Sequence, residues 1–157
     1  MPPIIPLDFI GSAWSLWPPH SDREGLNLVS GTRKIASDIL SVCLIRKGED
    51  PIHPSLGLAP DLFEPLSNYA PQYWVYHVQD EISRWVAGIE RLSVDVVDYE
   101  DYKNRLVTEV RFVPKQEADN HILTFGWYAY QGAIWDRDFD TFLDEITLDG
   151  SPFKALR

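Results

Sequence analysis

The first regular pattern in the chain is that of an amphipathic helix. Ser30 or Thr32 can cap its start, and Gly48 is a natural C-terminal stop. Arg46 continues the predicted buried face into the last turn, where it and Lys47 would suit the helix dipole. The apolar positions that define this face recur at i, i+4, i+7 and i+8: Ile35, Ile39, Val42 and Cys43.

A second helical pattern follows a loop rich in proline and glycine. Pro71 suits the first turn of this helix, and Ala87-Gly88 ends it. Its apolar stripe is widened by Val75 and Val86 and otherwise consists of Trp74, Val78, Ile82 and Trp85.

From Leu92 onward the period changes from that of a helix to that of a strand. Leu92, Val94 and Val96 alternate with polar residues, and two further alternating stretches span 106–113 and 121–130. The connections are too short for parallel crossovers, so the pattern predicts an antiparallel meander of about three strands.

The two ends of the chain differ from this central part. Five prolines in residues 1–28 exclude long helices, yet Trp17 and its apolar neighbours predict an extended arm that packs on the domain or on a partner. Residues 134–146 have helical spacing, and six acidic residues with one basic residue lie between 136 and 149. We therefore predict an α+β fold in one domain, with an arm (1–28), a core (29–131) and an acidic extension (132–157) that begins with a short helix.

Composition narrows the class of protein. The 157 residues carry a formal net charge of −10, which disfavours binding to nucleic acid. The single cysteine, Cys43, allows no internal disulfide, and its position on an apolar helix face predicts a buried, unreactive thiol. No run is long enough to span a membrane, and the first residues lack the pattern of a cleaved signal peptide.

The sequence shows little catalytic apparatus. Asp136, Asp138 and Asp140 begin like a calcium loop, but the required glycine and glutamate do not follow. The four histidines are far apart, and no phosphate-binding glycine loop or nucleophile elbow occurs. We expect no metal and no cofactor. Two carboxylates suffice for a glycoside hydrolase, so Glu64, Glu81 and Glu90 remain candidates for that chemistry.

Glu90 and Arg91 are adjacent charges between apolar Ile89 and Leu92, where the helical pattern gives way to the strand pattern. Neighbouring side chains of a regular strand point to opposite faces, so the two can pair only in a bend. Two interpretations stay open at this point. The charges are either solvated at a corner, where they contribute little, or they form a docking point.

Three segments follow one another in a recognisable order. The first runs from Gly11 through Trp17-Pro18-Pro19 to Gly31; the second runs from Ile35 through Lys47-Gly48-Glu49 to Pro54-Ser55-Leu56-Gly57; the third joins the helix ending at Trp85 to Ile89-Glu90-Arg91-Leu92 and a strand. Together they resemble the small baseplate-wedge and sheath-initiator family of contractile phage tails, which includes the related type VI secretion baseplate subunit. Arg91 and Leu92 match that family's Glu-Pro-Arg signature in place, whereas Glu90 is offset by one and the proline is absent.

The resemblance implies a structural protein rather than an enzyme. It would dock on the wedge core through Glu90, Arg91 and Leu92, with Trp85 and Trp17 as further contacts, and offer a sheet edge from 106–113 or 121–130 to the first sheath ring. The implied partners are other baseplate wedge subunits and the tail sheath protein, with tube or hub proteins as further candidates. The protein would be made in the host cytoplasm and reside in the virion tail. Some members are labelled lysozyme-like, so a glycoside hydrolase acting on peptidoglycan is the alternative.

Overall fold

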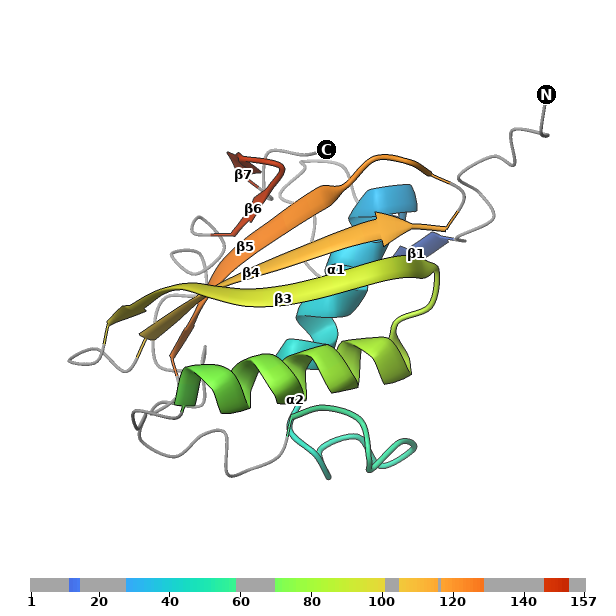
Figure 1. Cartoon of the computed structure of the whole chain (residues 1–157). Coiled ribbons are helices and arrows are strands. Elements are labelled where there is room, and N and C mark those ends of the chain that lie inside the picture. Colours follow the sequence, from blue (N-terminus) through green and yellow to red (C-terminus); the bar gives the residue numbers. More distant parts are fainter. Residues whose placement is uncertain are drawn as a thin grey trace, which may run out of the picture.

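The computed structural model describes residues 12–14, 28–58, 70–100, 105–115, 117–128 and 146–152. In these ranges the chain forms two helices, a five-stranded sheet and a separate pair of short strands (Figure 1). This confirms the predicted α+β class. The elements in chain order are β1 (Ser12–Trp14), β2 (Leu28–Ser30), α1 (Gly31–Leu44), α2 (Ala70–Trp85), β3 (Ile89–Glu100), β4 (Arg105–Pro114), β5 (His121–Tyr128), β6 (Thr147–Leu148) and β7 (Ser151–Pro152).

The large sheet is antiparallel throughout, in the order β3-β4-β5-β6-β7. The predicted meander is its first three strands. One row of cross-strand neighbours runs from β3 to β6 and is buried along its whole length, because all its members lie on the same face of the pleat: Val94, Val110, Leu123 and Leu148.

Both helices cover the face of the sheet on which this row lies. Figure 1 shows α1 crossing behind the sheet and α2 running along β3. The helices bury Ile35 and Ile39 from α1 and Val78 and Ile82 from α2 in a single apolar cluster with the inner sheet residues. The opposite face of the sheet carries the polar residues of the alternating pattern, and this face positions the candidate site.

The end of α1 differs from the prediction. The helix stops at Leu44, and Ile45 is extended, so Arg46 and Lys47 lie beyond the last turn and Arg46 is exposed. The cause is a tertiary contact. Leu58 exchanges backbone hydrogen bonds with Ile45 and Lys47 at 2.8 and 2.9 Å, which draws the chain out of the helix before Gly48.

The start of α1 agrees with the prediction in position only. Ser30 is the N-cap residue, but its side chain makes no capping hydrogen bond. Ser30 is also the last residue of β2. This strand pairs with β1, and β1 lies inside the segment 1–28 that was expected to be an extended arm. The backbone at Ser30 is therefore fixed by strand pairing rather than by a side-chain cap.

The C-terminal part adds strands that the sequence did not predict. β6 and β7 form a hairpin on β5, with Leu148 opposite Leu123. The sheet consequently has five strands rather than about three. The acidic helix predicted for 134–146 falls outside the described residues except at Ile146, which is buried and not helical. Within the described ranges, neither helix has the length and apolarity needed to cross a membrane.

Candidate partner-binding site

The predicted charged junction lies inside a strand. Ile89 pairs with Pro114 and Arg91 pairs with Val113, so Glu90 is the extra residue of a β-bulge near the start of β3. The bulge breaks the strict alternation of faces, and Glu90 and Arg91 are both exposed. No ion pair joins them within the described residues, so the pairing that a bend would have allowed does not form.

Leu92, by contrast, points toward the core. It is partly buried, packs against the apolar cluster and stands opposite Phe112 of β4. This residue anchors the start of β3 to the core, and its predicted role in partner binding stays a prediction.

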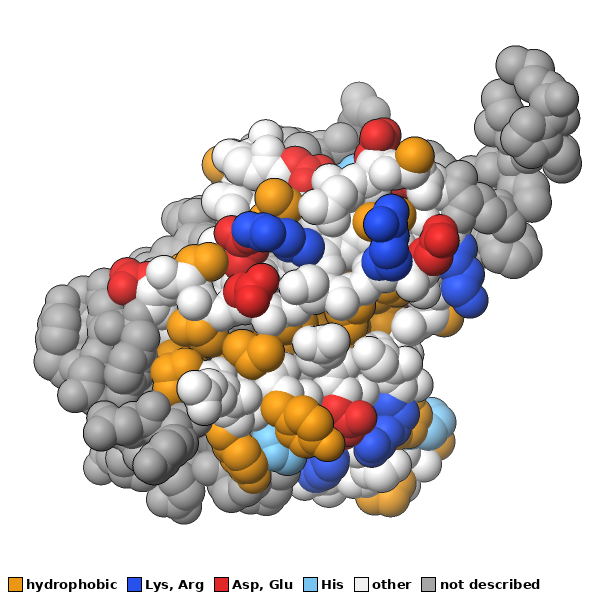
Figure 2. All heavy atoms as spheres, in the orientation of Figure 1, with side chains coloured by type: hydrophobic (Ala, Val, Ile, Leu, Met, Phe, Trp, Pro, Cys, Tyr) orange, Lys and Arg blue, Asp and Glu red, His pale blue; other side chains and the backbone are white. Residues whose placement is uncertain are grey.

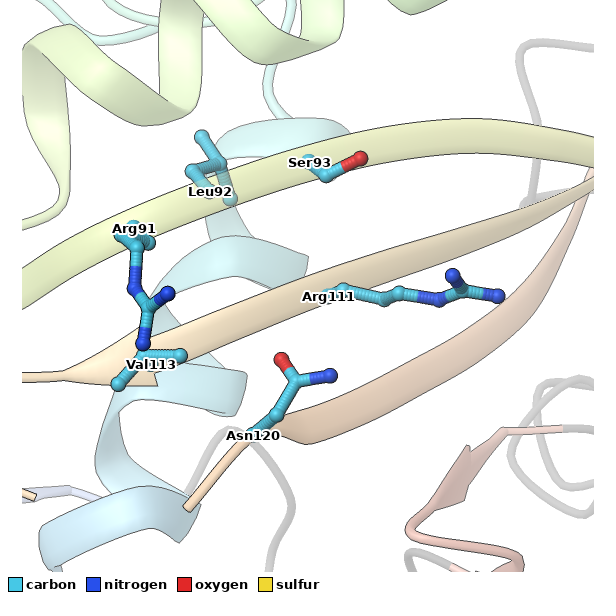
Figure 3. A pocket seen from close by; sticks show the side chains of 6 residues that line it. All are labelled: Arg91, Leu92, Ser93, Arg111, Val113 and Asn120. Carbon is cyan, nitrogen blue, oxygen red and sulfur yellow. The ribbon is translucent and has the colours of Figure 1, made fainter. Parts of the chain in front are cut away.

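Arg91 borders an open groove on the polar face of the sheet, with a volume of about 670 Å³. Figure 3 shows the Arg91 side chain reaching from β3 toward Val113, while Arg111 lies along β4 and Asn120 turns its amide toward the sheet. Six residues from three consecutive segments line the groove: Arg91, Leu92, Ser93, Arg111, Val113 and Asn120.

The groove is cationic although the whole chain has a formal net charge of −10. Its lining contains two arginines and no carboxylate. Glu109 holds the guanidinium of Arg111 at 2.6 Å from Nε and 2.5 Å from a terminal nitrogen, which fixes its direction. Arg91 has no such partner in the described part of the chain. The groove therefore offers one positioned and one uncommitted guanidinium.

Trp85 lies at the end of α2, away from this groove. Its ring meets His53 edge-on with centroids 5.8 Å apart, so it packs under the loop that follows α1. The Trp85 ring is half-buried, and its buried indole Nε1 lacks a hydrogen-bond partner among the described residues. Trp17, the other predicted aromatic contact, lies outside the described residues.

The carboxylates considered for hydrolysis lie in unlike surroundings. Glu81 on α2 is 2% exposed, and its Oε1 receives Lys47 at 3.2 Å and Arg84 at 3.3 Å, while Oε2 is buried without a described partner. Glu90 is exposed on the bulge, and Glu64 lies outside the described residues. Nothing in these surroundings marks Glu81 and Glu90 as an acid pair.

Two other titratable residues are engaged in structure. Cys43 is buried as predicted, and this burial raises the pKa of its thiol to about 12, which disfavours the reactive thiolate. His121 at the start of β5 meets Asp149 at 2.7 Å and Glu117 at 3.3 Å. Desolvation lowers the pKa of His121, but these two carboxylates more than offset it and the net shift is upward. Within the described ranges, no group of three His, Cys, Asp or Glu side chains could hold a metal ion.

The sequence found Arg91 but missed the other polar residues of the groove. Ser93, Arg111 and Asn120 come from three segments that only the sheet brings together. The sequence did contain a hint, because Ser93 and Arg111 stand at the polar positions of their alternating strand patterns. Deciding that they stand directly opposite each other required the register of β3 against β4.

Comparison with known proteins supports the fold. No family model and no curated protein sequence matches the chain. A crystal structure from Geobacter sulfurreducens, described provisionally as a tail lysozyme, matches with a TM-score of 0.56 and 19% identity, over 66% of this chain and 96% of that one. At this identity the match shows that the two chains share a fold.

Proposed function

We propose that this protein is a structural subunit of a contractile phage tail baseplate, which docks on the wedge core and starts sheath assembly by offering a sheet edge. The observation that carries the proposal is the placement of Arg91. Arg91 matches the arginine of the family's Glu-Pro-Arg signature. It is exposed beside an open groove and has no ion-pair partner among the described residues. The shared fold with a protein described as a tail lysozyme is consistent with a tail protein.

Of the two sheet edges that the sequence predicted, the one at 106–113 is not an edge. β4 (Arg105–Pro114) is internal, because β3 and β5 pair with its two sides. β5 is bordered by β6 only at Leu123 and Thr124, which leaves part of its length as a lesser candidate. β3 ends the sheet and is twelve residues long, whereas β7 has two residues and one of them is proline.

We assign the edge to β3. A strand added there would satisfy backbone groups that pair with no other described strand, with little dependence on side chains. The bulges at Glu90 and Val97 divide this edge into short regular sections, which would limit pairing with unrelated strands before assembly.

The direct test is Arg91→Ala in the intact phage or prophage. The exposed side chain contributes little to folding, so the variant should keep wild-type thermal stability while its incorporation into tails falls by about tenfold or more. Arg84→Ala is the control, because Arg84 is also an exposed arginine but lies on α2. Since Arg84 pairs with Asp80 and with buried Glu81, the thermal stability of this variant is measured alongside. Normal incorporation of the Arg91 variant would contradict docking through this residue, and absence of the wild-type protein from purified contractile tails would contradict the proposed function itself.

A further inference from the structure

The polar face of the sheet has an ordered distribution of charge. Three pairs of residues stand directly opposite each other across β3 and β4, two residues apart along each strand: Arg91 with Val113, Ser93 with Arg111, and Asp95 with Glu109. The first two rows line the groove and are cationic, and the third is a pair of carboxylates. Figure 2 shows basic and acidic side chains close together over this part of the surface.

The internal contacts of this face satisfy only part of the charge. Arg111 is committed to Glu109 on the same strand. Asp95 faces Glu109, a like charge, and its described contact is a long hydrogen bond of 3.4 Å from the Ser93 hydroxyl. Among the described residues, Arg91 and Asp95 have no ionic partner. The face thus presents one uncommitted positive and one uncommitted negative charge, both exposed.

The distance between these two charges follows from the strand. Arg91 and Asp95 are four residues apart on one side of β3, which corresponds to about 13 Å at the rise of an extended chain. An extended segment lying along β3 would match them with an acidic and a basic residue that are also four positions apart. Val113, opposite Arg91, gives the groove an apolar contact for a segment at that end.

We propose that this face binds an extended segment of a partner protein, with an acidic side chain in the groove at Arg91 and a basic side chain at Asp95. The inference rests on the proposed function, because it takes the partner to be a neighbouring baseplate subunit. It adds the chemistry of the partner and the register in which the segment lies. The order of charge on β3 also sets the direction of the segment, since reversing it would bring like charges together.

Charge complementarity favours this occupant over a polyphosphate chain. Asp95 and Glu109 lie two residues, or about 7 Å, along the strands from the Ser93–Arg111 row, which is within the Debye length of about 8 Å at physiological salt, and they would repel a continuous line of phosphates. A small anion would fill the groove but leave Asp95 unmatched. A segment of mixed charge satisfies both ends.

The test is zero-length cross-linking with a carbodiimide, which joins a carboxylate to an amine in direct contact. The assembly that contains the tagged, full-length protein is isolated from its native host. The exposed Arg91→Lys substitution keeps the positive charge and supplies a reactive amine. Gln79→Lys supplies an amine at an exposed position of α2 as a control, with no carboxylate three or four positions away on the helix. In this assembly, cross-linking of the native Asp95 carboxylate to a partner amine tests the other end of the site.

The expected result is that the amine introduced by Arg91→Lys is joined to an Asp or Glu of a partner, about tenfold or more above the Gln79→Lys control. Asp95 should be joined to a partner lysine that lies four residues from the carboxylate cross-linked at position 91. Where that partner residue is arginine, Asp95 should instead be protected from an added small amine. No partner carboxylate at position 91, attachment of that position to nucleic acid, or an Asp95 fully open to the small amine would overturn the inference. Whether sheath and wedge proteins are present in the isolated assembly tests the proposed function separately.

Discussion

The indole nitrogen of Trp74 on α2 donates a 2.9 Å hydrogen bond to the hydroxyl of Thr108 on β4, inside the core. Both residues are at most 1% exposed. This contact ties the helix to the inner face of the sheet. Thr108→Val keeps the shape of the side chain but removes the acceptor of a buried donor, so it should lower the free energy of unfolding by about 1–3 kcal/mol.

Urea denaturation measures this loss, and a double-mutant cycle isolates it. Trp74→Phe removes the donor together with part of the ring, so its cost includes a cavity. In the Trp74→Phe background, Thr108→Val should cost clearly less than it does in the wild type, because the donor is already gone. Equal costs in the two backgrounds would show that the hydrogen bond contributes nothing.

Gly57 holds the loop after α1 against Ile45. Its φ is +103°, and a Cβ atom there would lie 2.2 Å from the Ile45 carbonyl oxygen. That oxygen accepts a hydrogen bond from the backbone N–H of Leu58, so moving it away would break this bond. Gly57→Ala should therefore destabilise the protein by more than the roughly 1–2 kcal/mol that a positive φ costs an L-residue.

Gly48 provides the matched control for this prediction. Its φ is +93°, but nothing lies within 4 Å of the position that its Cβ would take. Gly48→Ala should carry the conformational cost alone, so thermal unfolding should rank Gly57→Ala well below it. Equal melting temperatures for the two variants would contradict the close approach to Ile45.

His121 should make stability depend on pH near neutrality. Its pKa is raised in the folded protein by Asp149 and Glu117, against the opposing effect of burial. The stabilisation is complete below the unfolded value of about 6.5 and is lost as the pH rises through the higher folded value. The difference in free energy of unfolding between wild type and His121→Gln should therefore shrink as the pH rises from about 6.5 through the higher folded pKa. A difference that stays constant or grows over this range would mean that Asp149 and Glu117 do not hold a protonated His121.

The purified protein should release no soluble fragments from peptidoglycan. Glu81 is buried in ion pairs with Lys47 and Arg84, and Glu90 is exposed on the bulge, so neither is placed as half of a catalytic pair. Fragment release would be measured across the pH range with a known lysozyme as reference. Release that disappears in Glu64→Gln, Glu81→Gln or Glu90→Gln would establish the hydrolase alternative instead.

The periodicity of the sequence was sufficient to predict which residues are buried where burial follows from the geometry of a single helix or strand. Ile35, Ile39 and Cys43 on α1, and Trp74, Val78 and Ile82 on α2, are buried as the helical spacing predicts. The alternation of Leu106, Thr108, Val110 and Phe112 likewise identified the inner face of β4. These patterns are local, because a period of 3.6 or 2 follows from the geometry of one helix or one strand.

Contacts between distant segments decided the features that the sequence missed. Leu58 ends α1 by pairing with Ile45, and Leu123 of β5 receives the hairpin that carries Leu148. Neither pairing can be predicted from the periodicity of the sequence, because each joins two segments that are far apart in the chain.

The sequence by itself determined that this is an α+β protein with two buried helix faces, an antiparallel sheet and an arginine at position 91 beside the first strand. Only the tertiary structure decided that β3 ends the sheet, that a bulge exposes Glu90 and Arg91 together, and that Arg111 and Asn120 complete the groove. The physical reason is register. A shift of one residue between β3 and β4 would turn these side chains to the other face, and that register is set by packing across the whole sheet rather than by either strand alone.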